Sequence, residues 1–235
     1  MLCPTLNGLK EWYKSGEADC AWDDVTGTQL DAKEVRKARE DEMKFIRDMR
    51  VYDKVPRSRA WRAGKKVIGV RWIDINKGDS VNPKYRSRMV AKEFKDSIAH
   101  EMFAATPPVE ALRMIVSWAA SWSNQDEEQR AVMACDISRA FFHAEAGDDM
   151  YVELPEEDQV PGRDLVGKLR LALYGTREAA AAWQKEVCKH LTQIGFIKGM
   201  FNPCLFQHPE RQIRVMVHGD DYVAAGPRSL SLIHI

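Results

Sequence analysis

Residues 131–142 read AVMACDISRAFF and residues 213–225 read IRVMVHGDDYVAA, so each stretch carries aspartate where an apolar run ends. Such short apolar runs predict buried β-strands, and the tetrapeptide His218-Gly219-Asp220-Asp221 between IRVMV and YVAA predicts a tight hairpin. A carboxylate at the end of an apolar strand is costly without a partner, and a divalent cation is a common partner. Asp136, Asp220 and Asp221 are therefore the candidate catalytic residues and metal ligands.

Two strands that set these aspartates side by side could hold two Mg²⁺ ions about 4 Å apart, the clamp used for in-line displacement at phosphorus. The long sequence separation between the two stretches does not show that the strands are neighbours. An Asp-Asp pair after a glycine is also typical of an ordinary turn. The residues alone leave both interpretations open.

The rest of the chain predicts a mixture of helices and strands. A helix is expected from Asp31, where Glu34 completes a capping box, to about Arg50, and a hairpin is expected where VIGVRWIDI (67–75) and YRSRMVAKEF (85–94) flank NKGDSVNP. Further expected elements are a helix over 107–122, strands over 150–154 and 165–173, and a helix from an N-cap at Thr176 to a stop at Gly195. Residues 1–30 lack periodicity and are expected to be irregular. Without regular βαβ alternation, the predicted fold class is α+β with a mainly antiparallel sheet.

Charge is segregated along the chain, although 35 basic and 35 acidic residues balance overall. Residues 54–95 contain thirteen Lys and Arg against three acids, Asp74, Asp79 and Glu93. This basic segment could bind a phosphate backbone by displacing counterions, but a solvated, salt-bridged surface would have the same composition.

The composition indicates an intracellular globular protein. The chain has 235 residues, of which 45% are apolar, enough for one large domain or two small ones. Its five cysteines are an odd number at wide spacings, which is typical of reduced thiols rather than of a disulfide framework. The N-terminus lacks an apolar signal core, and the longest apolar stretch, ALRMIVSWAASW, is too short to span a bilayer.

The order of the motifs resembles that of copia-type retrotransposon reverse transcriptases over nearly the whole chain. The family's basic segment Tyr-Lys-Ala-Arg-Leu-Val-Ala-Lys-Gly-Phe is matched by Tyr85 to Phe94, and its Phe-Ala-Pro-Val-like stretch leading to Arg is matched by Phe103, Pro108, Val109 and Arg113. Its aspartate followed by Ala-Phe at the fourth and fifth positions is matched by Asp136, Ala140 and Phe141, and its Leu-Tyr-Gly-Leu-Lys-Gln-Ala-Pro-Arg-x-Trp motif by Leu173 to Trp183. Its Gly-Phe is matched by Gly195 and Phe196, and its Tyr-Val-Asp-Asp box by His218 to Asp221. Several weak motifs in one order are far more specific than any of them alone.

The chain also departs from the family pattern near the expected site. His218 and Gly219 replace Tyr and Val, Glu93 replaces Gly, and Ala180 and Ala181 replace Pro-Arg. None of these changes removes a metal ligand. A glycine beside the ligand is expected to loosen the turn, and Glu93 adds negative charge near the expected phosphates.

The resemblance implies an RNA-directed DNA polymerase with right-hand architecture, in which the basic hairpin (about 54–95) belongs to the fingers and the aspartates lie on the palm (about 130–225). It implies two Mg²⁺ ions, which Mn²⁺ can replace, a primed RNA or DNA template and deoxynucleoside triphosphates. Asp136 and Asp220 would bridge the ions, with Asp221 as an auxiliary ligand. The other residues assigned are Arg86, Arg88, Lys92, Phe141, Tyr174 and Gly175 for the nucleotide, and Lys65, Lys66 and Arg71 for nucleic acid.

Two aromatic positions have competing interpretations. Phe141 falls where the family excludes the 2′-hydroxyl of a ribonucleotide, but it could equally be a core residue like Phe142, and an extended backbone would let only one of the pair face the site. Trp183 belongs to the apolar stripe of the predicted helix, so it is interpreted as packing.

Two rival functions belong to other classes. A two-aspartate phosphatase or nuclease would use the same metal chemistry, but the basic hairpin and the motif order argue against it. The stronger rival is a catalytically dead retroelement remnant that at most binds nucleic acid.

The C-terminal end carries a further expectation. Residues 230–235, Leu-Ser-Leu-Ile-His-Ile, equal the translation of CTGTCTCTTATACACATC, a transposase end sequence used in sequencing libraries, so they are expected to be a non-native tail. The family's thumb and RNase H segments follow the Asp-Asp hairpin, so residues 31–229 are expected to be fingers and palm without a thumb. Such a fragment is expected to be inactive alone.

Overall fold

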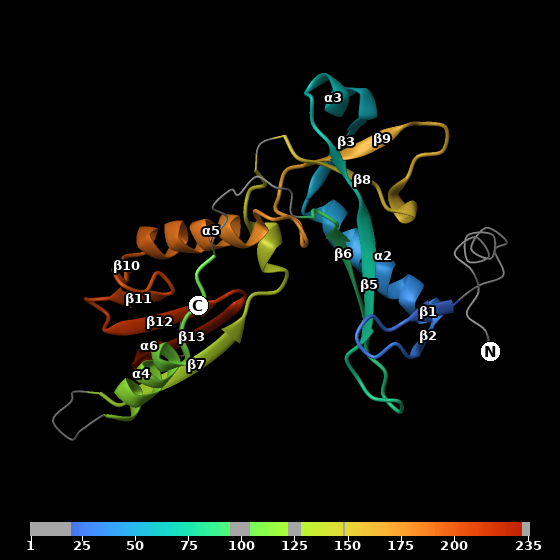
Figure 1. Cartoon of the computed structure of the whole chain (residues 1–235). Helices are drawn as coiled ribbons and strands as arrows, with labels where there is room; N and C mark the ends of the chain where they lie inside the picture. The colour runs from blue at the N-terminus through green and yellow to red at the C-terminus, as the bar shows by residue number, and fades with distance from the viewer. Residues whose placement is uncertain (1–19, 95–103, 122–127, 148, 232–235) are drawn as a thin grey trace. The chain divides into compact units, whose positions relative to one another are not determined.

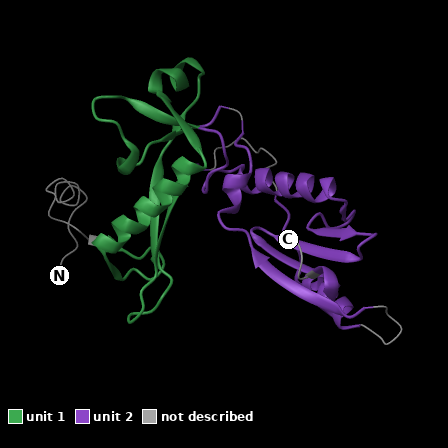
Figure 2. Cartoon of the chain, turned by 180° about the vertical axis from the view of Figure 1, so that it is seen from behind, with its two compact units in different colours: residues 1–92, 151–168 green, residues 93–150, 169–235 purple. Residues whose placement is uncertain are grey.

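The computed structural model describes residues 20–94, 104–121, 128–147 and 149–231. They form two compact units, which Figure 2 shows in different colours: unit 1 is residues 1–92 and 151–168, and unit 2 is residues 93–150 and 169–235. Both units combine helices with β-sheets (Figure 1). The pairing is mainly antiparallel, whereas β4 pairs parallel with β8. The predicted α+β class is therefore confirmed.

Unit 1 contains two small sheets and a two-stranded hairpin around one long helix. Its elements are β1 (Cys20–Trp22), β2 (Gln29–Asp31), α2 (Ala32–Asp48), β3 (Tyr52–Pro56), α3 (Arg57–Arg62), β4 (Val67–Ile68), β5 (Val70–Asn76), β6 (Tyr85–Ala91), β8 (Tyr151–Glu153), the 3₁₀ turn η2 (Glu156–Asp158) and β9 (Leu165–Leu169). The second sheet has the order β3-β9-β8-β4. The predicted basic hairpin is present as β5 and β6, paired antiparallel from Val70 opposite Ala91 to Asn76 opposite Tyr85.

The helix α2 begins where the sequence predicts. The Asp31 carboxylate accepts the backbone N–H groups of Lys33 (2.8 Å) and Glu34 (3.3 Å), which satisfies two donors of the first turn. The N–H of Asp31 itself donates to the Tyr85 hydroxyl at 3.5 Å. The N-cap is thus confirmed, and it also connects the start of α2 to the end of the hairpin.

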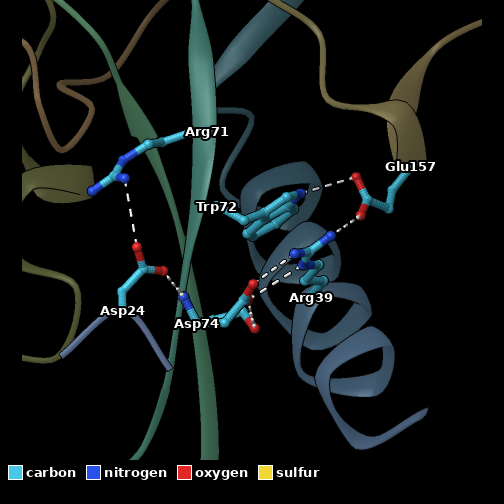
Figure 3. A network of polar contacts seen from close by, with 7 residues as sticks. Asp24, Arg39, Arg71, Trp72, Asp74 and Glu157 are labelled. Atoms are coloured by element: carbon cyan, nitrogen blue, oxygen red, sulfur yellow. Dashed lines mark hydrogen bonds and ion pairs between the residues drawn. The ribbon is translucent and has the colours of Figure 1, made fainter. Parts of the chain in front are cut away.

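A buried carboxylate fixes α2 against the hairpin. Asp74 of β5 is 5% exposed and accepts two bonds from the Arg39 guanidinium (3.2 and 2.5 Å) and one from the Ser87 hydroxyl (2.6 Å). Figure 3 shows Arg39 between Asp74 and Glu157, beside Trp72, whose indole N–H donates to the Glu157 carboxylate at 3.1 Å. A buried charge needs such partners, so the bonds of Asp74 hold this face of the hairpin against α2.

The expectation of an irregular lead-in is wrong for residues 20–30. Here β1 and β2 pair antiparallel, and the turn between them contacts the edge of β5. The Asp24 carboxylate accepts the N–H of Asp74 (2.9 Å), and the Asp23 carboxylate accepts the N–H of Asn76 (2.7 Å). The pairing depends on these distant backbone groups, which no local periodicity reveals. The part of the lead-in before residue 20 lies outside the described residues.

The Asp23 carboxylate should make this contact sensitive to acid. Its backbone bonds, first that from Asn76 and then that from Thr26, lower the pKa of Asp23 from its ordinary 3.8 to about 2. A depressed pKa contributes stability that is present above about pH 4 and is lost as pH falls towards 2. We expect protection of the Asn76 amide against hydrogen exchange to fall over this window, and Asp23→Asn to remove the dependence. Asp48→Asn, an exposed carboxylate at the end of α2, is the control, and an identical pH profile in Asp23→Asn would contradict the assignment.

Unit 2 is a five-stranded antiparallel sheet with a helix on each face. Its elements are α4 (Val109–Ala120), β7 (Arg130–Asp136), the 3₁₀ turn η1 (Ala140–His143), α5 (Ala179–Gln193), β10 (Ile197–Lys198), β11 (Leu205–His208), β12 (Ile213–His218), β13 (Asp221–Pro227) and α6 (Arg228–Ser231), and the strand order is β10-β11-β12-β13-β7. Figure 1 shows α5 and α4 on opposite faces of this sheet. Val215 and Val217 pack in the cluster of α5, whereas Met216 between them packs in the cluster of α4. The strand β12 is therefore covered on both faces of the sheet, in agreement with the predicted buried strand.

The helix α5 carries the predicted stripe but does not begin where predicted. Trp183, Val187 and Leu191 are buried against the sheet. Thr176 is not the N-cap, because its hydroxyl donates to the Leu173 carbonyl (2.8 Å) in the preceding turn, and Glu178 holds the N-cap position instead. The predicted stop at Gly195 is confirmed: its φ is +98°, and the N–H of Phe196 donates to Leu191 O at 3.0 Å.

Three further sequence expectations can be compared with the structure. The thiols of Cys135, Cys188 and Cys204 are free, in agreement with reduced cysteines. Among the described residues, no helix is both long and apolar enough to cross a membrane. Of the suspected non-native tail, α6 includes Leu230 and Ser231, and residues 232–235 lie outside the described residues. The origin of the tail stays a prediction.

Candidate catalytic and nucleic-acid site

The two aspartate stretches lie on neighbouring strands. β13 pairs antiparallel with β7, and Asp221 is directly opposite Asp136. The N–H of Ile137 donates to Asp220 O at 2.8 Å, so Asp136 and Asp221 form a non-hydrogen-bonded pair, the type in which facing side chains come closest. Their Cβ atoms are then about 4.5–5.5 Å apart on one face of the sheet. The sequence separation left this neighbourhood open, and the register establishes it.

The third aspartate lies in the turn that joins β12 to β13. His218 pairs with Asp221, which leaves Gly219 and Asp220 as a two-residue turn. Gly219 has a φ of +62°, and Asp220 is not among the residues with positive φ, the pattern of a type II′ hairpin turn. The predicted tight hairpin is confirmed, and it places Asp220 next to the Asp136–Asp221 pair.

The turn has a contact that the sequence did not reveal. The indole N–H of Trp183, on α5, donates to the Gly219 carbonyl at 2.7 Å. Trp183 was predicted to be packing, and it is 7% exposed in the core between α5 and the sheet. A buried indole N–H needs an acceptor, and this requirement is the one signal in the sequence that pointed to a polar role.

The donor set suits Mg²⁺ more than an ion that needs a closed protein cage. Asp136 and Asp221 are exposed and Asp220 is half-buried. In the described parts of the chain, no three His, Cys, Asp or Glu side chains are grouped so that they could hold a metal ion as they stand. Mg²⁺ usually takes one or two protein carboxylates and completes its shell with water and substrate phosphates. Exposed carboxylates at adjacent strand ends therefore fit Mg²⁺.

The residues behind the aspartates add no charge to the site. Tyr222 and Cys135 face each other on the opposite side of the sheet. Burial raises the pKa of Tyr222 to about 12, and burial followed by the nearby Asp136 raises the pKa of the Cys135 thiol. Both groups are neutral at pH 7, so the negative charge here belongs to the aspartates.

The predicted sugar gate lies in a helical turn rather than in an extended strand. Residues 140–143 form η1, and Phe142 is completely buried whereas Phe141 is partly exposed. Phe141 lies against Tyr174, with ring centroids 4.8 Å apart, and lines a cavity of about 80 Å³ together with Trp183 and Gly219. The adjacent Gly175 has a φ of +80°, a conformation that favours glycine. The structure thus brings Phe141, Tyr174 and the Gly219–Asp220 turn into one region of unit 2.

The predicted phosphate-binding cations share one face of the hairpin. In the β5–β6 register, Arg88 is opposite Ile73, Arg86 is opposite Ile75 and Arg71 is opposite Val90. These positions alternate with Asp74 and Ser87, whose side chains face α2, so the arginines point to the other side. Lys92 continues the same alternation after β6 and is exposed.

Part of the basic segment is already engaged within unit 1. Lys54 pairs with Asp158 (3.0 Å), Arg57 pairs with Glu153 and Asp164 (2.7 Å each), and Arg71 pairs with Asp24 (3.5 Å). For Lys54 and Arg57 the salt-bridged interpretation is correct, whereas the Arg71 side chain is 54% exposed beside Asp24. Lys65 and Lys66 follow α3 and are exposed. The cations belong to unit 1 and the aspartates to unit 2, so their action on one ligand stays a prediction.

One departure from the family pattern is explained by a local contact. The Glu93 carboxylate accepts the N–H of Arg177 at 2.8 Å, so it connects residue 93 to the segment that leads into α5.

Of the Phe-Ala-Pro-Val-like positions, Arg113 is exposed on α4 and lies 3.9 Å from Glu110. Phe103 lies outside the described residues.

Known proteins resemble most of this chain in sequence. Residues 51–233 match the family described as reverse transcriptase (RNA-dependent DNA polymerase). Similar proteins include three Pol polyproteins named as retrovirus-related: that of transposon TNT 1-94 of Nicotiana tabacum (26% identical, 74% of this chain and 13% of the relative), that of transposon RE2 of Arabidopsis thaliana (27%, 72% and 12%) and that of transposon RE1 of Arabidopsis thaliana (28%, 68% and 11%). The chain thus spans about an eighth of the length of the relatives that it matches. It belongs to the reverse transcriptase family of copia-type retrotransposon Pol polyproteins.

Proposed function

We propose that this chain is the fingers and palm part of an RNA-directed DNA polymerase, which adds deoxynucleotides to a primer 3′-hydroxyl with two Mg²⁺ ions. The observation that carries the proposal is the register of β7 and β13, which sets Asp136 opposite Asp221 with Asp220 in the adjoining turn. Family membership supports the reaction class, and the register supports the choice of these three carboxylates as the metal ligands.

Each aspartate has a distinct role in the proposal. Asp136 and Asp220 hold the two ions from β7 and from the turn, and Asp221 supports them as an auxiliary ligand. When bound, the ions lower the pKa of the primer 3′-hydroxyl and neutralise charge on the triphosphate and its leaving group. Because Asp136 and Asp221 face each other, their mutual repulsion favours binding of a divalent ion.

The cations of unit 1 are proposed to bind phosphate. Arg86, Arg88 and Lys92 grip the triphosphate, which is supported by their shared position on the hairpin face opposite α2. Lys65, Lys66 and Arg71 bind the nucleic-acid backbone. In this assignment unit 1 is the fingers and unit 2 is the palm. Tyr174, Gly175 and Phe141 line the nucleotide pocket, supported by the contact between the Phe141 and Tyr174 rings.

Adjacent phenylalanines should behave differently when shortened. Phe141→Val should admit ribonucleotides if this ring is the sugar gate. Phe142→Val should instead destabilise the fold by about 2 kcal/mol or more, since it leaves a cavity in a fully buried position. The measurements are primer extension with ribonucleotides and urea unfolding of both variants. Relaxed sugar selection in Phe142→Val alone would show that the two roles are exchanged.

The experiment for the proposed function is primer extension on a homopolymer template with Mg²⁺ or Mn²⁺. The chain would be assayed alone and joined to the downstream region of a related element. Metal-dependent extension is the expected result for the joined protein. Binding of primer–template without any extension would instead favour a non-catalytic nucleic-acid-binding remnant. Location in a cytoplasmic particle or the nucleus stays a prediction.

A further inference from the structure

We propose that Trp183 is a positioning residue of the catalytic hairpin: its indole N–H fixes the Gly219–Asp220 turn and thereby the Asp220 carboxylate. The inference rests on the proposed function, because it gives Asp220 a metal to hold. It concerns a tryptophan that does not need to touch metal, nucleotide or nucleic acid itself.

The turn is held through its two carbonyl groups. Gly219 O accepts the Trp183 indole N–H (2.7 Å), and Asp220 O accepts the N–H of Ile137 (2.8 Å). The first bond comes from α5 and the second from the backbone just after Asp136. Together they connect the turn to α5 on one side and, on the opposite side, to the end of β7, the strand that carries Asp136.

The turn depends on these bonds because it has little packing of its own. Gly219 is exposed, and a Cβ at this position would meet nothing within 4 Å. Glycine also has the largest conformational freedom of any residue, so its presence favours alternative shapes of the turn. The cavity of about 80 Å³ beside Gly219 leaves room for the turn to shift. A bond from a fixed donor offsets both effects.

Trp183 is such a fixed donor. It is 7% exposed and packs in one core cluster with Val187 and Leu191 of α5 and with Val217 of β12. Val217 is the second residue before Gly219, so the indole contacts the strand that leads into the turn. Since the ring is immobilised by packing, its N–H defines a position for the Gly219 carbonyl to within hydrogen-bond tolerance.

This role predicts an effect on turnover rather than on substrate binding. Trp183→Phe keeps an aromatic ring in the core and removes the N–H. The displaced turn should weaken metal binding and lower kcat, each by about 10- to 100-fold, the usual effect of losing a group that orients a metal ligand. The KM for nucleotide should change little, because the proposed triphosphate-binding cations lie on the hairpin in unit 1.

The test uses hydrogen exchange and Mn²⁺ titration of the 235-residue chain, and kcat of the chain joined to the downstream region of a related element. The reporter is the Ile137 amide, whose acceptor is Asp220 O. The control is Trp118→Phe, which removes another indole of unit 2 from the opposite face of the same sheet, where Arg130 and Arg214 lie over its ring. We expect faster exchange at Ile137, weaker Mn²⁺ binding and lower kcat in Trp183→Phe, and none of these in Trp118→Phe.

A second variant separates position from general stability. Val187→Ala should destabilise the same core without removing the indole bond. In this variant, protection of the Ile137 amide should therefore fall only as far as the global stability falls. Unchanged Ile137 exchange in Trp183→Phe would overturn the inference whether or not the protein polymerises. Faster exchange with unchanged kcat would overturn the catalytic role while leaving the proposed polymerase function intact. An inactive wild type that nevertheless exchanges as expected would overturn the proposed function and the role of Trp183 in it.

Discussion

Asp136→Asn should reduce Mg²⁺-dependent primer extension by on the order of a thousandfold or more in the joined protein. Metal stabilisation of the transition state is worth several kcal/mol, and each 1.36 kcal/mol corresponds to a factor of ten in rate. Asparagine keeps the shape of the side chain but cannot supply the negative charge that the two ions of the proposed site would share. Asp221→Asn should be milder, because Asp221 is assigned an auxiliary role.

The stability of the same variant makes this result interpretable. Asp136 is exposed and directly opposite Asp221, so the substitution removes a like-charge pair and should leave the melting temperature unchanged or slightly higher. The matched control is Glu210→Gln, an exposed acid of the same unit that lies between β11 and β12. Activity of Asp136→Asn close to that of Glu210→Gln would refute the metal assignment.

Asp158→Asn should produce the largest loss of stability among the polar substitutions considered. The Asp158 carboxylate is 4% exposed and accepts bonds from Arg47 Nε (2.8 Å) and the Tyr52 hydroxyl (2.8 Å), with Lys54 Nζ at 3.0 Å. Burial, and then the neighbouring Asp158, raises the pKa of Tyr52, so this hydroxyl stays a donor at any ordinary pH. Three donors from α2 and β3 therefore depend on one acceptor.

Removing one partner of such a buried group costs about 3–5 kcal/mol. We expect the lower end, about 3 kcal/mol, because Arg47 and Lys54 are partly exposed and can turn to water. This is a large part of the 5–15 kcal/mol that is typical of a whole domain. Urea unfolding measures it, and Glu156→Gln, an exposed acid on the same 3₁₀ turn, is the control. Equal midpoints for the two variants would show that Asp158 does not organise unit 1.

Local features of the fold could be predicted from the sequence. The hairpin turn at Gly219, the N-cap at Asp31 and the stop at Gly195 each depend on residues only a few positions apart, and all three are present. Thr176 shows the limit of such reasoning. A threonine before a helical pattern is a good N-cap, but its hydroxyl here closes the preceding turn on Leu173.

The candidate site was only partly predictable, because its geometry depends on long-range pairing. The sequence supplied Asp136, Asp220 and Asp221, but their spacing could not show that Asp136 and Asp221 are cross-strand partners. The bond from Trp183 to Gly219 depends on where α5 crosses the sheet, which helical periodicity does not specify. In the same way Asp158 sits in an acidic, loop-like stretch, and its burial follows from cations more than a hundred residues away in the chain.

The interleaving of the two units in the sequence has a consequence for synthesis of the protein. β7 is translated before the second segment of unit 1, and its partner β13 is translated only after it. At roughly 5–20 residues per second, β7 waits on the order of ten seconds for that partner. During this interval an apolar strand has an unpaired edge that other chains can join, a recognised route to aggregation. The order of translation thus determines when Asp136 and Asp221 first become neighbours. Slower growth at low temperature, which weakens apolar association, should improve the yield of folded chain.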